Sequence, residues 1–373
     1  MTDIDVFLRG FGEESGYLDY GRVGPLSSVV QDEVRGQVDL LGRARFGMAD
    51  LLGSQDGRMR SAVSALTGFA PANIVSQPNT SMGLMHTMFG ITGGLLLSAG
   101  DFPSLTVAAR RAADALQVLT PTWLETDHGR VTPHTIKEQL TPAITAVAVS
   151  LVDTRTGYLA DLDGIRQVIG DRLLIVDAIQ GFGVVDAPYE VADVVASGGR
   201  KWVRAGYGTG FLALSDHALE HLVPVVSGYT GTDEDEPWDA VPPPSRLARA
   251  YSVAGGDYSA DGRLAAALEE VAAVGVDEIS AVVSDRVSEV LDLADEFALS
   301  VASPRAPHER AGIVLLDPPD EHISLLVASL HNHGVSATLR QNKVRLSVHA
   351  GTSSETIGML RDSLVSFSTA IAY

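Results

Sequence analysis

Residues 191–214 read VADVVASGGRKWVRAGYGTGFLAL and place a lysine in a glycine-rich turn between two apolar runs. Both runs, VADVVASG and GTGFLALS, are short and bounded by turn residues, which is typical of strands. The turn between them, SGGRKWVRAG, carries three cations among small residues. We therefore expect Lys201 beyond the end of a strand, either as a surface charge or as a reactive amine.

Helical and strand patterns alternate over about residues 60–215. Short apolar runs such as TAVAVSLV and RLLIVDA are separated by amphipathic segments such as SLTVAARRAADALQVL. This alternation predicts an α/β fold with a mostly parallel central sheet sandwiched by helices. After the acidic loop TGTDEDEPWDAVPPPSR at 230–246, mixed helices and short strands predict a smaller α+β domain. The expected division is a large domain over 21–255 and a small domain over 256–373, with 1–20 associated with the small domain.

Composition excludes several classes of function. The formal net charge of −20 argues against nucleic acid or an anionic membrane surface as a partner, because both require clustered cations. No apolar stretch approaches the roughly 20 residues that span a bilayer, and the first residues show no secretion signal, so a cytoplasmic protein is expected. The chain has no cysteine, which excludes disulfides, thiolate ligands and a persulfide on the protein. Its ten histidines show no metal-ligand spacing, so we expect no metal site.

An acid and an amine follow two predicted strands. Asp177 ends the apolar run RLLIVD, and Lys201 follows the next strand along the chain. Ligands of open α/β sheets gather at the carboxyl ends of strands. Pyridoxal phosphate needs a lysine for its aldehyde and a carboxylate for its ring nitrogen, so this pair predicts that cofactor.

A phosphate site is also predicted, in the segment IVSQPNTSMG at 74–83. Thr80 and Ser81 follow a strand and a turn and open a helix, whose free N–H groups favour an anion. Taken alone, the same pattern also fits a plain helix cap. The glycines of GYGTG at 206–210 precede a strand and thus do not form a dinucleotide fingerprint, and the Walker pattern does not occur.

In their combined order, these motifs resemble the class V aminotransferases, a fold type I pyridoxal-phosphate group that includes cysteine desulfurases and isopenicillin N epimerase-like proteins. The resemblance runs from YLDYGRVGPLS at 17–27, through VDAIQGFGVVDA at 176–187 and the lysine turn, to KVRLSVHAGTSSETI at 343–357. It implies a large cofactor-binding domain, a smaller C-terminal domain and a homodimer. The Arg-Lys-Trp triplet at 200–202 also resembles the C–S lyases of ergothioneine biosynthesis.

The resemblance implies a role for each matching residue. Lys201 would be the Schiff-base lysine, Asp177 the partner of the pyridine nitrogen, Gln180 a hydrogen-bond donor to the phenolic oxygen, Phe102 the ring stacked on the cofactor face, Thr80 and Ser81 the phosphate turn, Arg345 the ligand of the substrate's α-carboxylate, and Thr154 a polar neighbour of that carboxylate. A core phenylalanine and an exposed strand arginine are the alternatives for Phe102 and Arg345. Arg340 is also placed on a strand, as an exposed charge.

The chain departs from the family pattern at two places. Many relatives carry a serine three residues before the lysine and a histidine immediately before it, where this chain has Gly198 and Arg200, with Ser197 one residue earlier. Arg200 and Ser197 are therefore expected at the phosphate. Relatives also carry Gly-Thr, which reaches the neighbouring subunit's phosphate, where this chain has Gly256-Asp257. A carboxylate repels a phosphate, which places that contact in question.

The resemblance leaves the reaction open. The substrate would be an amino acid, and transamination is the first expectation, followed by β-elimination at a C–S bond and then by epimerisation. A desulfurase that stores sulfur on its own thiol is excluded, because the chain has no cysteine. Outside the enzymes, a catalytically silent binding protein with the same fold is the alternative.

Overall fold

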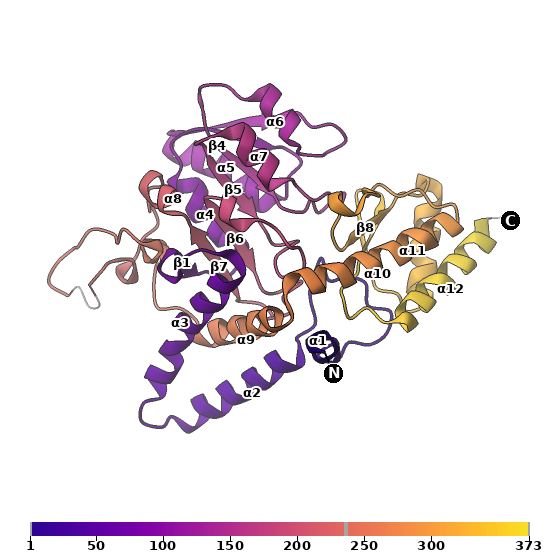
Figure 1. The fold of residues 1–373 in the computed structure, drawn as a ribbon, viewed down its shortest axis with the longest axis horizontal. Coiled ribbons are helices and arrows are strands. Elements are labelled where there is room, and N and C mark those ends of the chain that lie inside the picture. Colours follow the sequence, from indigo (N-terminus) through magenta and orange to yellow (C-terminus); the bar gives the residue numbers. More distant parts are fainter. Residues whose placement is uncertain (1, 235–237, 372–373) are drawn as a thin grey trace.

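A seven-stranded sheet forms the centre of the larger part of this computed structural model, which describes residues 2–234 and 238–371 (Figure 1). In spatial order its strands are β1 (Ile74–Ser76), β7 (Gly210–Leu214), β6 (Val194–Gly198), β5 (Leu173–Asp177), β4 (Ile144–Ser150), β2 (Gly93–Ser98) and β3 (Leu119–Leu124). Strand β7 runs antiparallel to both neighbours, and the other six are parallel to one another. The predicted α/β fold with a mostly parallel sheet is confirmed.

Helices bury both faces of the sheet. One face packs against α4 (Thr80–Gly90), α5 (Pro103–Leu116) and α8 (Asp216–His221), and the other against α3 (Met48–Thr67), α6 (Pro133–Gln139), α7 (Leu162–Ile169) and α9 (Tyr258–Val274). Alternate residues of β4 belong to the two cores, Ala146 and Ala148 to the first and Val147 and Val149 to the second. Burial on both sides explains why the strands read as unbroken apolar runs.

A second, three-stranded sheet lies in the C-terminal part, with the order β8 (Ile313–Leu316), β10 (Lys343–Ser347) and β9 (Thr338–Arg340). It is accompanied by α10 (Val276–Glu296), α11 (Asp320–Asn332) and α12 (Ser354–Ile371), and α10 leads to it from the larger part (Figure 1). The N-terminal segment joins it through bridges from Tyr17 to Ser336 and from Asp19 to Ser347.

Helix α9 packs mainly against α3 and α2 (Ser28–Arg43), although it lies beyond the boundary expected at residue 256. The N-terminal helix α1 (Asp3–Arg9) also contacts α9. The domain limits themselves stay a prediction.

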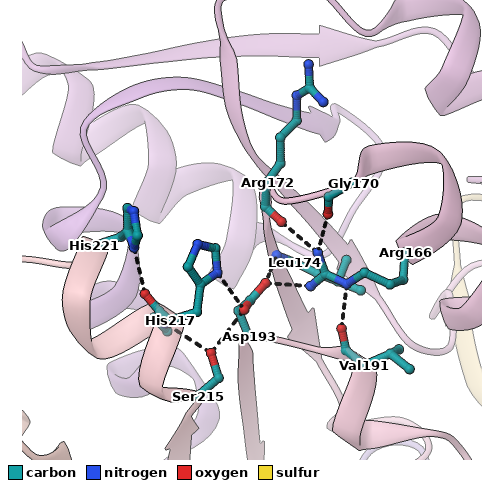
Figure 2. Close-up of polar contacts among 10 residues, drawn as sticks. Arg166, Gly170, Arg172, Leu174, Val191, Asp193, Ser215, His217 and His221 are labelled. Carbon is teal, nitrogen blue, oxygen red and sulfur yellow. Dashed lines mark hydrogen bonds and ion pairs between the residues drawn. The ribbon is translucent and has the colours of Figure 1, made fainter.

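Asp193 ties the amino ends of the strands together (Figure 2). It immediately precedes β6 and accepts hydrogen bonds from the Leu174 amide at 2.8 Å and the Ser215 hydroxyl at 3.0 Å. Arg166 of α7 forms an ion pair with it at 2.5 Å, and Nδ1 of His217 lies 3.0 Å away. Because Lys201 follows the opposite end of β6, this network supports the site strands from the far edge of the sheet.

The acidic loop predicted at 230–246 is described except for residues 235–237, which lie outside the described residues. Trp238 and Val241 in it are exposed. Within the described part of the chain, no helix is long and apolar enough to cross a membrane.

Candidate active site

The lysine turn is held by its own backbone and by the N-terminal segment. Gly199 donates to the Thr209 carbonyl at 3.1 Å, and Ala205 donates back to the Gly199 carbonyl at 2.7 Å. Gly24 donates to the Arg200 carbonyl at 2.8 Å. A Cβ atom at Gly24 would lie 1.9 Å from the Lys201 carbonyl oxygen, so this close approach of two chain segments requires glycine.

Lys201 and Asp177 line one cavity of about 430 Å³ beyond the carboxyl ends of β5 and β6. Their exposed fractions are 4% and 2%. Burial lowers the pKa of Lys201, and the positive charges of Arg200, Arg345 and Arg340 lower it further. The negative charge of Asp177 raises it, but by less than these effects lower it. Burial raises the pKa of Asp177, although the Ile179 amide at 3.1 Å and Lys201 oppose this. The amine is therefore biased toward its neutral, nucleophilic form.

The start of α4 borders the same cavity. Asn79 caps the helix by accepting from the Met82 amide at 3.0 Å, and Thr80 and Ser81 follow as its first residues. A Cβ atom at Gly198 would lie 3.1 Å from the Thr80 hydroxyl oxygen, so glycine opens the strand end toward the helix terminus. Exposed backbone N–H groups at a helix start favour an anion.

Arg200 lines the cavity near this helix start. Its guanidinium donates to the Arg22 carbonyl at 3.0 Å and lies 5.8 Å from the centre of the Tyr207 ring. These contacts leave it without a carboxylate partner among the described residues, so its charge is available to an anion in the cavity.

Phe102 forms another wall and immediately precedes α5. Its ring centre lies 5.7 Å from Lys201 Nζ and 5.9 Å from Arg340 Cζ. The ring therefore lies beside the Lys201 amine rather than in the core. Arg340 of β9 lies beside the same ring.

Arg345, Thr154 and Gln180 form a buried chain of hydrogen bonds. Arg345 donates to the Thr154 hydroxyl at 2.9 Å and pairs with Asp19 at 3.5 Å, while its Nε has no partner among the described residues. Gln180 donates to Thr154 at 3.3 Å and to the Gly21 carbonyl at 3.0 Å, and accepts from the Trp202 indole at 2.9 Å. Gln180 is thus fully engaged within the protein and does not line the cavity.

Two further residues from the sequence analysis lie away from the cavity. Ser197 is fully buried on β6, its hydroxyl has no partner among the described residues, and its neighbour Gly198 borders the cavity instead. Asp257 caps α9 by accepting from the amides of Ser259 and Ala260 at 3.0 and 3.1 Å. The roles of all these residues toward a cofactor stay predictions.

The cavity also includes residues that the sequence analysis did not assign. These are Pro78, Asn79, Ser104, Ile179, Tyr207, Gly208 and Thr209. Ser104 lies 2.6 Å from Ser81, hydroxyl to hydroxyl. Its position two residues after Phe102 was a usable signal, whereas nothing local marks Tyr207 as a cavity residue.

The class-V aminotransferase model matches residues 80–361, which is most of the chain. The chain belongs to the class-V aminotransferase family. No protein with a curated description matches it.

Solved structures with a similar fold include cysteine desulfurases and a C–S lyase. An apo cysteine desulfurase from Thermococcus onnurineus has a TM-score of 0.82 and 20% identity, with 92% of each chain covered. The cystine C–S lyase C-DES, in complex with cysteine persulfide, has a TM-score of 0.84 and 18% identity, with 95% of this chain and 97% of that one covered. The Escherichia coli cysteine desulfurase CsdA has a TM-score of 0.83 and 17% identity, with 100% and 99% covered. At these identities the likeness shows the fold.

Pyridoxal phosphate is the cofactor of this family, and the site suits it. A buried amine and a buried carboxylate line one cavity, and no hydrogen bond joins them among the described residues. A molecule between them with a carbonyl on one side and a basic ring nitrogen on the other would satisfy both. The helix start at Thr80 and the cation of Arg200 supply a place for its phosphate. The chain is therefore a class-V pyridoxal-phosphate enzyme.

Proposed function

We propose that this class-V enzyme is an aminotransferase that acts on an amino acid. The observation that carries the proposal is that Lys201 is the single amine of the described cavity lining, which contains no histidine and no glutamate. A single mobile base suits the transfer of a proton from the amino acid's Cα to the nearby carbon of the cofactor's aldehyde group. Transamination requires this step.

Each wall of the cavity would hold one part of the cofactor. Lys201 would hold the aldehyde, Asp177 the ring nitrogen and Phe102 one face of the ring. Thr80, Ser81 and Arg200 would hold the phosphate. When bound, pyridoxal phosphate supplies an electron sink for negative charge that develops at the amino acid's Cα.

Arg345 and Lys201 would then handle the substrate. The Arg345 guanidinium, oriented by Thr154, would bind the α-carboxylate, because its planar fork matches that group. Lys201 Nζ, biased toward its neutral form, would take the proton from the substrate's Cα and deliver it to the carbon of the cofactor's aldehyde group. Two-base epimerisation has less support, because the described lining offers no second amine or histidine.

β-Elimination at a C–S bond is the second candidate. It is supported by the shared fold with the cystine C–S lyase C-DES, and by a leaving thiolate that needs no separate general acid. Because the chain has no cysteine, released sulfur would leave without storage on the protein.

The test is a panel of amino acids given to the enzyme loaded with pyridoxal phosphate. Transamination predicts a keto acid together with pyridoxamine phosphate, in equal amounts in a single turnover without an amino acceptor. If pyruvate and ammonia accumulate without pyridoxamine phosphate, together with sulfide from cysteine or cysteine persulfide from cystine, the enzyme is a C–S lyase. The Lys201→Ala variant serves as the control and should form neither set of products.

We also propose that the enzyme is a homodimer in the cytoplasm. The dimer is supported by exposed apolar side chains that cluster along the chain: Val223, Val225, Val226, Tyr229, Leu247, Val253 and Tyr258. Light scattering at micromolar concentration should give twice the chain mass, and a single chain mass would refute the dimer.

A further inference from the structure

Cations gather at this site in a chain that is otherwise strongly acidic. The protein has 27 lysines and arginines against 47 aspartates and glutamates. Two of those cations, Arg200 and Lys201, line the cavity. Three more lie near its lining residues: Arg340 is beside the Phe102 ring, the charge of Arg345 lowers the pKa of Lys201, and the carbonyl of Arg22 accepts a hydrogen bond from Arg200. Among the described residues, Arg345 alone of the five has an ion-pair partner, Asp19. Charges of one sign that lack partners raise the local concentration of anionic ligands.

The cofactor and the α-carboxylate do not account for all of these charges. The proposed function assigns Arg200 to the phosphate and Arg345 to the α-carboxylate. Arg22 and Arg340 remain without an assignment. The carbonyl of Arg22 accepts a hydrogen bond from Arg200, and the charge of Arg22 lowers the pKa of Arg345. The charge of Arg340 lowers the pKa of both Lys201 and Arg345.

Arg340 is the better placed of the two remaining arginines. Its Cζ lies 5.9 Å from the centre of the Phe102 ring, almost as near as Lys201 Nζ on that ring. It ends β9, opposite Lys343 of β10, and Gln341 and Asn342 turn the chain with φ of 47° and 59°. A turn of this kind is the tight hairpin type, so the backbone next to Arg340 is well defined.

We propose that Arg340 binds an anionic group at the end of the substrate's side chain, and that the enzyme acts on acidic α-amino acids. This inference rests on the proposed function, because it requires the α-amino acid to react at Lys201. The shared chemistry is a carboxylate or phosphate on a short side chain, which a guanidinium binds through paired, charge-assisted hydrogen bonds. Arg22 strengthens the attraction through its charge.

Binding is measured first with ligands that cannot react. The holoenzyme is titrated by calorimetry with glutarate and with its monoamide, which differ by one charged group. Glutarate should bind about 10- to 100-fold more tightly, the range expected for a hydrogen bond between charged groups. Added salt should weaken glutarate binding more than monoamide binding, because the difference is electrostatic.

Variants then assign this preference to Arg340. Arg340→Gln should lower glutarate affinity about 10- to 100-fold and leave the monoamide within about twofold. Arg340→Lys keeps the charge and should keep part of the preference. Arg35→Gln is the matched control, because Arg35 is an exposed arginine on α2 that pairs with Asp32 alone among the described residues.

Turnover identifies the anionic group. The arms compare L-glutamate with L-glutamine, L-aspartate with L-asparagine, and O-phospho-L-serine with L-serine. The acidic member of at least one pair should react faster by the factor seen in binding, and Arg340→Gln should remove that advantage.

Two results would overturn the inference: equal binding of glutarate and its monoamide, or an equal loss for both in Arg340→Gln while Arg35→Gln is unaffected. If the charge preference depends on Arg340 but no keto acid forms from any amino acid, the binding site stands and the aminotransferase proposal fails.

Discussion

Gly24→Ala should impair the enzyme by moving the lysine turn, although Gly24 contacts no substrate. The new Cβ would lie 1.9 Å from the Lys201 carbonyl oxygen and 3.0 Å from Arg204 Cγ. The first of these is a backbone atom, so the turn has to retreat by about 1 Å, a misplacement that can cost about 100-fold in rate. Forced overpacking should also lower the free energy of unfolding by about 1–3 kcal/mol.

Stopped-flow single turnover with a reactive amino acid measures the rate, and urea denaturation measures stability. Gly36→Ala is the matched control, because Gly36 is an exposed helical glycine whose added Cβ meets no atom within 4 Å. The control should keep its rate and gain about 0.5–1 kcal/mol of stability. A Gly24→Ala rate within about twofold of wild type would refute the idea that this contact positions Lys201.

The remaining predictions concern pH, stability and substrate binding. Burial and neighbouring cations lower the pKa of Lys201. The rate of pyridoxal phosphate attachment to the apo-protein should therefore rise with pH and level off at a pH well below the ordinary lysine pKa of about 10.4. A rate that still rises at that pH would contradict this. Burial raises the pKa of Asp193, but the Leu174 amide, His217 and Arg166 outweigh it and hold the pKa below the ordinary value. Asp193→Asn should therefore lower the free energy of unfolding, measured by urea denaturation at pH 7, by about 2–4 kcal/mol. The difference in free energy of unfolding between variant and wild type should disappear as the pH falls below about 4, where the carboxylate's contribution is lost. A difference that is constant with pH would show that the charge of Asp193 is not its cause. Arg345→Ala should raise KM for acidic and neutral amino acids alike with a smaller change in kcat, and an unchanged KM would remove Arg345 from the substrate site.

Sequence patterns were sufficient where the site depends on neighbouring strands. Asp177 ends β5 and Lys201 follows β6, and these strands are adjacent and parallel, so their carboxyl ends meet at one edge. The helix start at Thr80 was equally local, because the strand, turn and helix follow one another directly in the chain.

Contacts between distant segments could not be predicted in the same way. Asp19 and Arg345 are separated by 326 positions, and no local pattern relates them. The approach of Gly24 to Lys201 and of Arg340 to Phe102 also depends on how the N-terminal segment and the second sheet pack on the larger part. The approach of Gly24 to Lys201 determines how closely the turn is packed. The approach of Arg340 to Phe102 supports the inferred substrate class.

Ser197 shows a limit of a different kind. The family pattern suggested a phosphate role because a serine stands one residue from the usual place. Successive side chains of a strand point to opposite faces, so a shift of one residue along β6 leaves Gly198 at the cavity and Ser197 outside its lining. Strand periodicity applied to that residue would have predicted this.

The most direct test of the account is to map where pyridoxal phosphate attaches. The chain has three lysines, Lys137, Lys201 and Lys343. Lys137 is exposed and Lys343 pairs with Asp317, whereas Lys201 is buried beside the cavity. After borohydride reduction and peptide mass mapping, the account predicts one pyridoxyl group per chain on Lys201 and none on the Lys201→Ala variant. Stoichiometric labelling of Lys137 or Lys343, or no label at all, would contradict it.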